Sequence, residues 1–79
     1  MEQKKMRLTE GEPPQTYVVE QVELPLQTER RLEALGLTRG TSVTMMNKKK
    51  KGAVIVKIRG TRFAVGKHIG DHIQVREGA

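Results

Sequence analysis

NKKKKGAVIVKIRG, residues 47–60, sets a run of four lysines directly against an apolar segment. Apolar side chains alternate on both sides of the lysines and would share one face of each flanking strand: Val43 and Met45, then Val54, Val56 and Ile58. The residues that bracket the lysines, Asn47 and Gly52, are typical of hairpin loops. The stretch therefore predicts two antiparallel strands joined by a lysine-rich tip.

Residues 26–37 (LQTERRLEALGL) carry the signals of a short helix. Thr28 is the expected N-cap, and Glu29 suits the positive end of the helix dipole. Gly36 is the expected left-handed residue that ends the helix, and Leu37 then folds back as the hydrophobic contact of a Schellman motif. Because a helix of about two turns is not stable alone, it has to pack on the rest of the chain.

Several short segments complete the pattern. Residues 17–24 (YVVEQVEL) predict a strand, with Val18, Val22 and Leu24 on one face and Tyr17 and Val19 on the other. Residues 38–41 predict a type II turn, in which Gly40 takes the position that requires positive φ. Further short elements follow: a strand at 62–65, a turn or single helical turn at 66–71 and a strand at 72–75. Closely spaced strands with glycine turns predict a mostly β fold, a small barrel or sandwich.

The composition limits the function. The chain has 79 residues, the size of one small domain, and no cysteine, so it forms no disulfide or thiolate zinc site. A net charge of +6 favours an acidic partner: nucleic acid, anionic lipid or an acidic protein. With Tyr17 and Phe63 as the only aromatic residues, stacking platforms for single strands and grooves for proline-rich peptides are excluded. Without a long apolar run or a signal peptide, we expect a cytoplasmic protein.

Two longer runs are RRLEALGLTRGTSVTMM (residues 30–46) and VKIRGTRFAVGKHIGDHIQV (residues 56–75), preceded by MRLTEGE (residues 6–12). Together they resemble the FeoA family, ferrous iron transport protein A. The positions that match the family pattern are Leu32, Leu35, Gly36, Leu37 and Gly40, then Gly60, Ala64, Val65, Ile73 and Val75. The chain departs from the pattern at Arg39, where the family has proline, and at the lysine run.

The resemblance implies a small SH3-like barrel of five strands with one short α-helix. Residues 1–15, which mix charge with Gly11 and the Pro13-Pro14 pair, are interpreted from their composition as a tail and extended lead-in before the barrel domain at residues 16–79. The alternative for part of this lead-in, around residues 6–8, is a short additional edge strand.

The resemblance also implies a non-catalytic accessory protein of bacterial ferrous iron uptake. The implied partner is the cytoplasmic GTP-binding domain of the membrane permease FeoB, and Fe²⁺ or another divalent transition metal is a candidate ligand. Since the same barrel forms the C-terminal domain of iron-dependent repressors, the alternative is a free-standing regulatory or nucleic-acid-binding module.

Three side chains are candidates for a metal site: His68, Asp71 and His72. Two histidines four residues apart lie on one face of a helix, which suits Zn²⁺ or Fe²⁺. Against this, Gly70 weakens the helix, and His72 is expected at a helix-to-strand junction. We therefore favour solvated or capping histidines. Ser42 and Asp71, the only serine and the only aspartate, suggest no catalytic arrangement.

Two surfaces are candidates for partner contact. The basic patch consists of Lys48, Lys49, Lys50 and Lys51 and is read either as a solvated hairpin tip or as an electrostatic contact for phosphates. The second surface is the end of the helix with its following turn, and its candidate residues are Arg30, Arg31, Leu35, Gly36, Leu37 and Arg39. These residues either pack the core or present an apolar anchor with a cationic rim.

Overall fold

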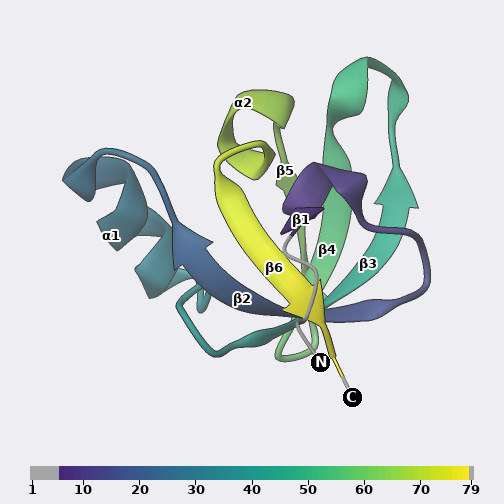
Figure 1. Ribbon diagram of the computed structural model, residues 1–79, viewed down its shortest axis with the longest axis horizontal. Coiled ribbons are helices and arrows are strands. Elements are labelled where there is room, and N and C mark those ends of the chain that lie inside the picture. Colours follow the sequence, from purple (N-terminus) through teal and green to yellow (C-terminus); the bar gives the residue numbers. More distant parts are fainter. Residues whose placement is uncertain (1–5, 79) are drawn as a thin grey trace.

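The computed structural model describes residues 6–78 of the chain. Its elements are β1 (Met6–Arg7), η1 (Leu8–Glu10, a 3₁₀ turn), β2 (Thr16–Val22), α1 (Leu26–Ala34), β3 (Ser42–Lys48), η2 (Lys50–Gly52, a 3₁₀ turn), β4 (Val54–Ile58), β5 (Thr61–Val65), α2 (Lys67–Gly70) and β6 (Ile73–Glu77). The strands form one antiparallel sheet in the order β1-β6-β2-β3-β4-β5 (Figure 1). The expectation of a mostly β chain with one short helix is confirmed.

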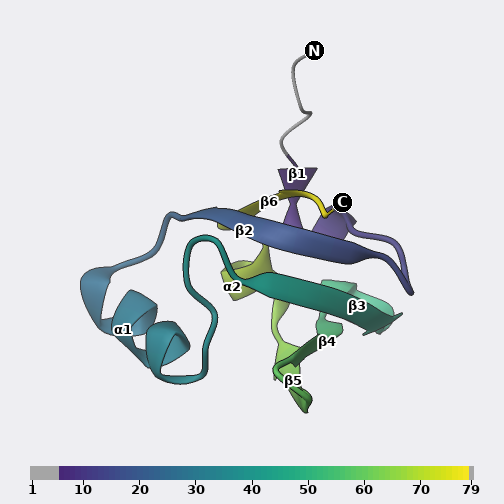
Figure 2. The same cartoon turned by 90° about the horizontal axis from the view of Figure 1, so that it is seen from below.

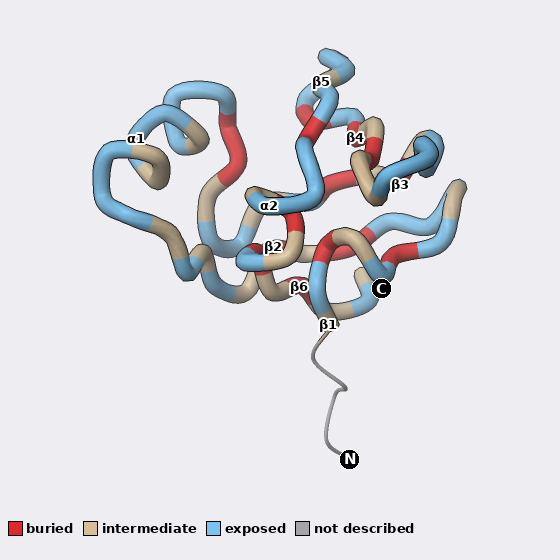
Figure 3. The backbone as a smooth tube through the Cα atoms, turned by 90° about the horizontal axis from the view of Figure 1, so that it is seen from above, coloured by how far each residue is buried: buried red, intermediate tan, exposed pale blue. Residues whose placement is uncertain are grey.

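The predicted hairpin is present and supplies much of the core. Met45 lies opposite Val56 in the β3–β4 ladder, and the five apolar side chains predicted for its inner face are all buried. The register shifts by one residue after Met45, so Met46 forms a bulge. A bulge bends its strand and increases the local twist, which curls the sheet around its apolar face. In Figure 3 the buried segments lie on the facing parts of the strands.

A second bulge, at Glu20 in β2, corrects the predicted strand faces. Val19 pairs with Val75 and Val22 pairs with Ile73, with one extra β2 residue between them. The extra residue places Val19 and Val22 on the same side, where both pack against the core. Strict alternation places Val22 on the face opposite Val19, and that prediction is wrong. A residue inserted by a bulge moves all later side chains of the strand to the other face, and alternation alone does not reveal the insertion.

The sheet has six strands where the sequence predicted five, and the sixth is the short edge strand that was the alternative for part of the lead-in. β1 pairs with β6 through Met6 and Arg7, and the next residue, Leu8, is completely buried. The folded domain therefore begins before residue 16. The part of the predicted tail at residues 1–5 lies outside the described residues.

Helix α1 begins earlier than predicted and ends where predicted. Its N-cap is Pro25, whose carbonyl accepts the Glu29 amide at 2.9 Å, so the assignment of Thr28 as N-cap is wrong. The fixed φ of proline already suits a helix start. At the other end, the Gly36 amide bonds the Glu33 carbonyl and the Leu37 amide bonds the Leu32 carbonyl. With Gly36 at φ +95°, this is the predicted Schellman motif.

The type II turn after the helix is also confirmed. The Thr41 amide donates to the Thr38 carbonyl at 3.0 Å, and Gly40 has φ +87°. Helix α1 lies beside the curled sheet (Figure 2), and none of its residues is fully buried. In the part of the chain that the structure describes, no helix has the length and apolar character needed to span a membrane.

Candidate docking site

The three leucines at the end of α1 have different environments. Leu37 is only 2% exposed and belongs to the core, whereas Leu35 is 48% exposed. Leu32 is half-buried and packs against the core from the helix. Of the two alternatives for this segment, core packing therefore applies to Leu37 and to the buried Gly36, and Leu35 is available for contact.

Leu35 lines an apolar groove between the end of α1, strand β5 and helix α2. The groove has a volume of about 130 Å³, similar to the roughly 150 Å³ of an apolar cavity that holds benzene. Its lining is apolar throughout: Leu32, Leu35, Leu37, Ile58, Phe63, Ala64, Val65, Gly66 and Ile69. A groove of this size and character accepts one aliphatic or aromatic side chain.

A second, larger groove of about 640 Å³ lies between α1 and β2 and has a different chemistry. Its lining includes three carboxylates, of Glu20, Glu29 and Glu33, together with the exposed Arg39. Glu20 forms an ion pair with Arg76, with 3.2 Å between Glu20 Oε1 and Arg76 Nε. Arg39 therefore lines the acidic groove and Leu35 lines the apolar one. The predicted surface, an apolar anchor with a cationic rim, is thus divided between two grooves.

Arg30 and Arg31 are both exposed on α1. A further apolar residue of α1, Leu26, is 59% exposed and was not among the predicted site residues. It occupies the first position of the helix, where the sequence signal was obscured because the helix was expected to start at Thr28. Phe63, Ala64 and Ile69, which line the apolar groove, were also missed because they come from elements far from α1 in the sequence.

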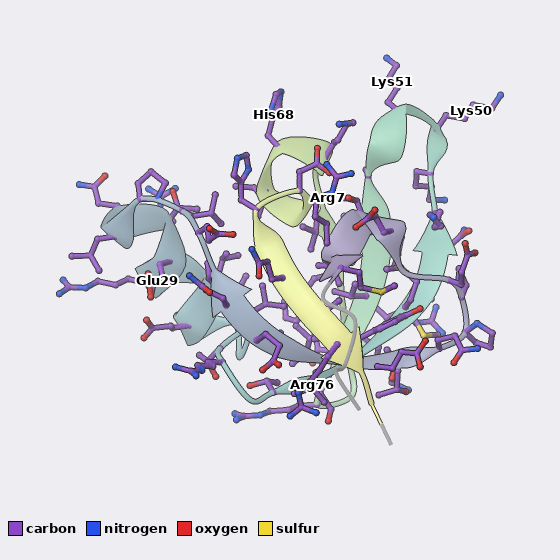
Figure 4. All side chains as sticks on the ribbon, in the orientation of Figure 1. Arg7, Glu29, Lys50, Lys51, His68 and Arg76 are labelled. Atoms are coloured by element: carbon purple, nitrogen blue, oxygen red, sulfur yellow. The ribbon has the colours of Figure 1, made fainter. Side chains whose placement is uncertain are left out.

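The structure does not assemble the three metal-site candidates. Helix α2 ends at Gly70, so His72 lies beyond it and its Nδ1 is 2.8 Å from the His68 carbonyl oxygen. His68 is exposed and points away from α2 into solvent (Figure 4). Across residues 6–78, no three histidine, aspartate or glutamate side chains are grouped so as to hold a metal ion.

The Asp71 carboxylate has structural partners instead. Lys67 Nζ lies 2.6 Å from one carboxylate oxygen, and the Thr9 hydroxyl donates to the other. These two hydrogen bonds lower the pKa of Asp71 from 3.8 to about 2. Both carboxylate oxygens already accept hydrogen bonds, one from η1 and the other from α2, so the Asp71 side chain connects these two elements.

The lysine run forms an exposed tip. Lys48 ends β3, Lys49 directly precedes η2, and Lys50 and Lys51 lie within η2, with Lys51 in the left-handed region at φ 71°. All four are exposed, and in Figure 4 the labelled Lys50 and Lys51 point outward from the tip. None of the ion pairs found in residues 6–78 involves them.

The comparisons with known proteins agree with this architecture. The FeoA domain model matches residues 6–77. The FeoA protein from Chlorobium tepidum aligns at 25% identity and a TM-score of 0.85, over 94% of this chain and 71% of that one. A crystal structure of an iron uptake regulatory protein (FeoA) aligns at 25% identity and a TM-score of 0.86, over 95% and 100% of the two chains.

The manganese regulator SloR aligns at a TM-score of 0.79 and 16% identity, over 91% of this chain and 34% of that one. At that identity it shows the fold alone, which is the SH3-like fold expected from the sequence. A comparison with curated proteins finds no match. The family model covers nearly all the described residues, including the β1 segment that begins the domain. The chain belongs to the FeoA domain family.

Proposed function

We propose that this protein is a non-catalytic accessory component of ferrous iron uptake that docks on the cytoplasmic GTP-binding domain of a FeoB-type permease. The observation that carries the proposal is Leu35, a half-exposed leucine at an apolar groove in a chain of the FeoA family. A leucine at a groove edge, with cationic side chains on the same helix, has the composition of a protein-binding anchor.

Docking would be driven by apolar burial and guided by charge. Removing the exposed part of one leucine side chain from water contributes about 1–2 kcal/mol. The exposed Arg30 and Arg31 on the same helix add long-range attraction to an acidic partner surface, which raises the association rate more than the affinity. In this mechanism Fe²⁺ is the permease's cargo, and the present chain supplies the protein contact.

The experiment is an amide chemical-shift titration of the full, isotope-labelled chain with the permease's cytoplasmic domain. We expect shifts around Leu35 and the groove residues of β5. Leu35→Asp should weaken binding about 10-fold or more. Leu26→Asp, which adds the same charge to another exposed leucine of α1, is the matched control and should bind normally. If the cytoplasmic domain causes no shifts in the wild-type chain, the proposal is wrong.

A nucleic-acid-binding module is the second candidate, and a specific observation favours it. No acidic residue occurs between Glu33 and Asp71, so the β3–β4 hairpin and β5 are purely cationic. Titrating the same labelled sample with duplex DNA separates the two functions. If DNA binds with submicromolar, strongly salt-dependent affinity and the permease domain causes no chemical-shift changes, the docking proposal is wrong and the nucleic-acid function takes its place.

A further inference from the structure

Strand β5 forms one edge of the sheet, and the backbone groups of two of its five residues face outward. Arg59 (φ 50°) and Gly60 (φ 84°) form a two-residue turn in which Ile58 pairs with Thr61. In such a hairpin the pair next to the turn is hydrogen-bonded, and bonded and non-bonded pairs then alternate. Thr61, Phe63 and Val65 therefore bond to β4, whereas the amides and carbonyls of Arg62 and Ala64 point away from the sheet.

These outward groups have no protein partner in the part of the chain that the structure describes. No backbone hydrogen bond outside the β4 ladder involves β5, and Arg62 and Ala64 are both exposed. An edge with free donors and acceptors is a template for another strand. The edge thus offers two amides and two carbonyls at the spacing of an antiparallel or parallel partner.

The free edge continues into the apolar groove. Phe63, Ala64 and Val65 of β5 line that groove together with Leu35 of α1. Side chains of an added strand would alternate between the two faces of the sheet, so every second one would turn toward the groove side. One aliphatic side chain of that strand could then occupy the groove volume of about 130 Å³.

The charge around this edge selects the partner. From the start of β4 to the first residue of α2 (residues 54–67), all charged residues are cationic: Lys57, Arg59, Arg62 and Lys67. Lys57 lies opposite Arg62, and only Lys67 has an acidic partner among the ion pairs of residues 6–78. A second copy of β5 would bring two cationic strands together, which is unfavourable. An acidic segment would neutralise Arg62 and its neighbours.

We propose that β5 accepts an extended, acidic segment of a partner protein as an additional strand, with one aliphatic side chain of that segment in the groove beside Leu35. This inference rests on the proposed docking function and specifies the shape and chemistry of the contact. Backbone hydrogen bonds to Arg62 and Ala64 hold the segment, the groove fixes its register, and the cations discriminate against basic or neutral segments.

The first test uses a short capped peptide in which Val, Leu and Ile alternate with Asp and Glu. On binding to the full chain, the Arg62 and Ala64 amides should become protected from hydrogen exchange by about 10-fold or more. The Phe63 and Val65 amides, which already bond to β4, should change little. A peptide with lysine in place of each acidic residue should not bind. Binding without protection of Arg62 and Ala64 would overturn the inference.

Two substitutions test the edge directly. Ala64→Pro removes an outward amide while leaving the β4 ladder intact, because proline is tolerated where an edge amide faces solvent. It should abolish peptide binding with the folded spectrum retained. Arg62→Glu should weaken binding about 10-fold, whereas Lys50→Glu, with the same charge change at the hairpin tip, should weaken it far less. Equal losses for the two charge reversals would overturn the inference.

The permease domain then separates this inference from the proposed function. If the domain binds and protects Arg62 and Ala64, both stand. If it binds without protecting them, docking stands and the strand-addition inference is wrong. If the peptide protects them and the domain does not bind, the edge is a strand-accepting site and the permease assignment is wrong.

Discussion

Gly36 shows how much of this molecule depends on one residue. It ends α1 in a left-handed conformation, and the same reversal sends Leu37 into the core while Leu35 stays at the groove. A Cβ added at Gly36 would lie 3.2 Å from Cγ2 of Ile58, a buried residue of β4. Both the backbone angle and the close packing therefore require glycine at this position.

We predict that Gly36→Ala destabilises the fold by about 1–2 kcal/mol from the left-handed conformation alone, with a further cost from the contact with Ile58. The measurement is the free energy of unfolding from urea denaturation. Gly66→Ala is the matched control, because Gly66 has φ −67° and nothing within 4 Å of an added Cβ. That variant should change stability by less than about 0.5 kcal/mol. Equal effects of the two substitutions would contradict the prediction.

Among the elements, η1 and α2 are joined by Asp71, the residue that directly follows α2. Its carboxylate accepts hydrogen bonds from the Thr9 hydroxyl of η1 and from Lys67 of α2. Neither element is long enough to be stable alone, since each is a single turn. Gly70 makes the close approach feasible, because a Cβ there would lie 2.6 Å from Thr9 Cγ2. The side-chain network thus connects the two short turns across one end of the sheet.

We predict that this network stabilises the fold above pH 3.8 and loses its effect as the pH falls toward 2. Because the pKa of Asp71 is lowered from 3.8 to about 2 in the folded state, its carboxylate contributes its full stability above pH 3.8 and progressively less as the pH falls through 2. The free energy difference between wild type and Asp71→Asn should therefore be largest above pH 3.8 and smallest below about pH 2. Urea denaturation at a series of pH values measures it.

A control is needed because the pKa of Glu10 is also lowered, by hydrogen bonds from Arg7, and titrates in the same direction. Glu10 is present in both proteins, so the part of its contribution that comes from Arg7 cancels in the comparison; the Asp71 charge, the smallest of the causes acting on Glu10, raises the pKa of Glu10 and is lost in the variant. Glu77→Gln, at the end of β6, controls for removing one exposed negative charge. A difference between wild type and Asp71→Asn that stays constant with pH would show that the ionised network adds no stability.

In the molecule as a whole, β6 is an interior strand although it comes last in the described sequence. It pairs with β1 on one side and with β2 on the other, and its residues Ile73 and Val75 are fully buried. Leu8, which follows β1, is also fully buried. The core is therefore closed by residues from both ends of the described chain.

We predict that a chain comprising only residues 16–79 fails to fold cooperatively. It lacks β1 and Leu8, and replacing one fully buried leucine by alanine alone costs about 2–5 kcal/mol, against a total stability of about 5–15 kcal/mol for a domain. Thermal unfolding followed by circular dichroism is the measurement, with a chain of residues 6–79 as the matched control. A cooperative transition of 16–79 at the control's midpoint would refute the prediction.

Local features of this fold were predictable from the sequence. Gly36 and Gly40 were placed correctly because each backbone reversal depends on residues within the same few positions. Leu8 and Val22 were not, since burial at residue 8 depends on a strand more than 60 positions away and the face of Val22 depends on a bulge. The inward-facing residues of β3 and β4 were predicted correctly, because the alternation in β3 is interrupted only after Met45, its last buried residue.

The candidate site was predictable only in part. Leu35 was identified, but its groove is completed by β5 and α2, which contact the helix only in the folded molecule. Arg39 was assigned to the same surface because it is near in sequence, and the type II turn directs it to the other groove. His68 and His72 matched a metal-ligand spacing that presupposes a continuous helix, whereas α2 ends at Gly70.

The interior position of β6 also constrains the order in which the sheet is completed. The ladders from β2 through β3 and β4 to β5 join strands that are neighbours along the chain, and such local pairings form early in folding. The β1–β6 and β2–β6 ladders need residues 73–77, so Leu8 and the core are enclosed only when β6 docks. Before that step the partly folded chain exposes apolar surface, which makes a folding intermediate prone to aggregate.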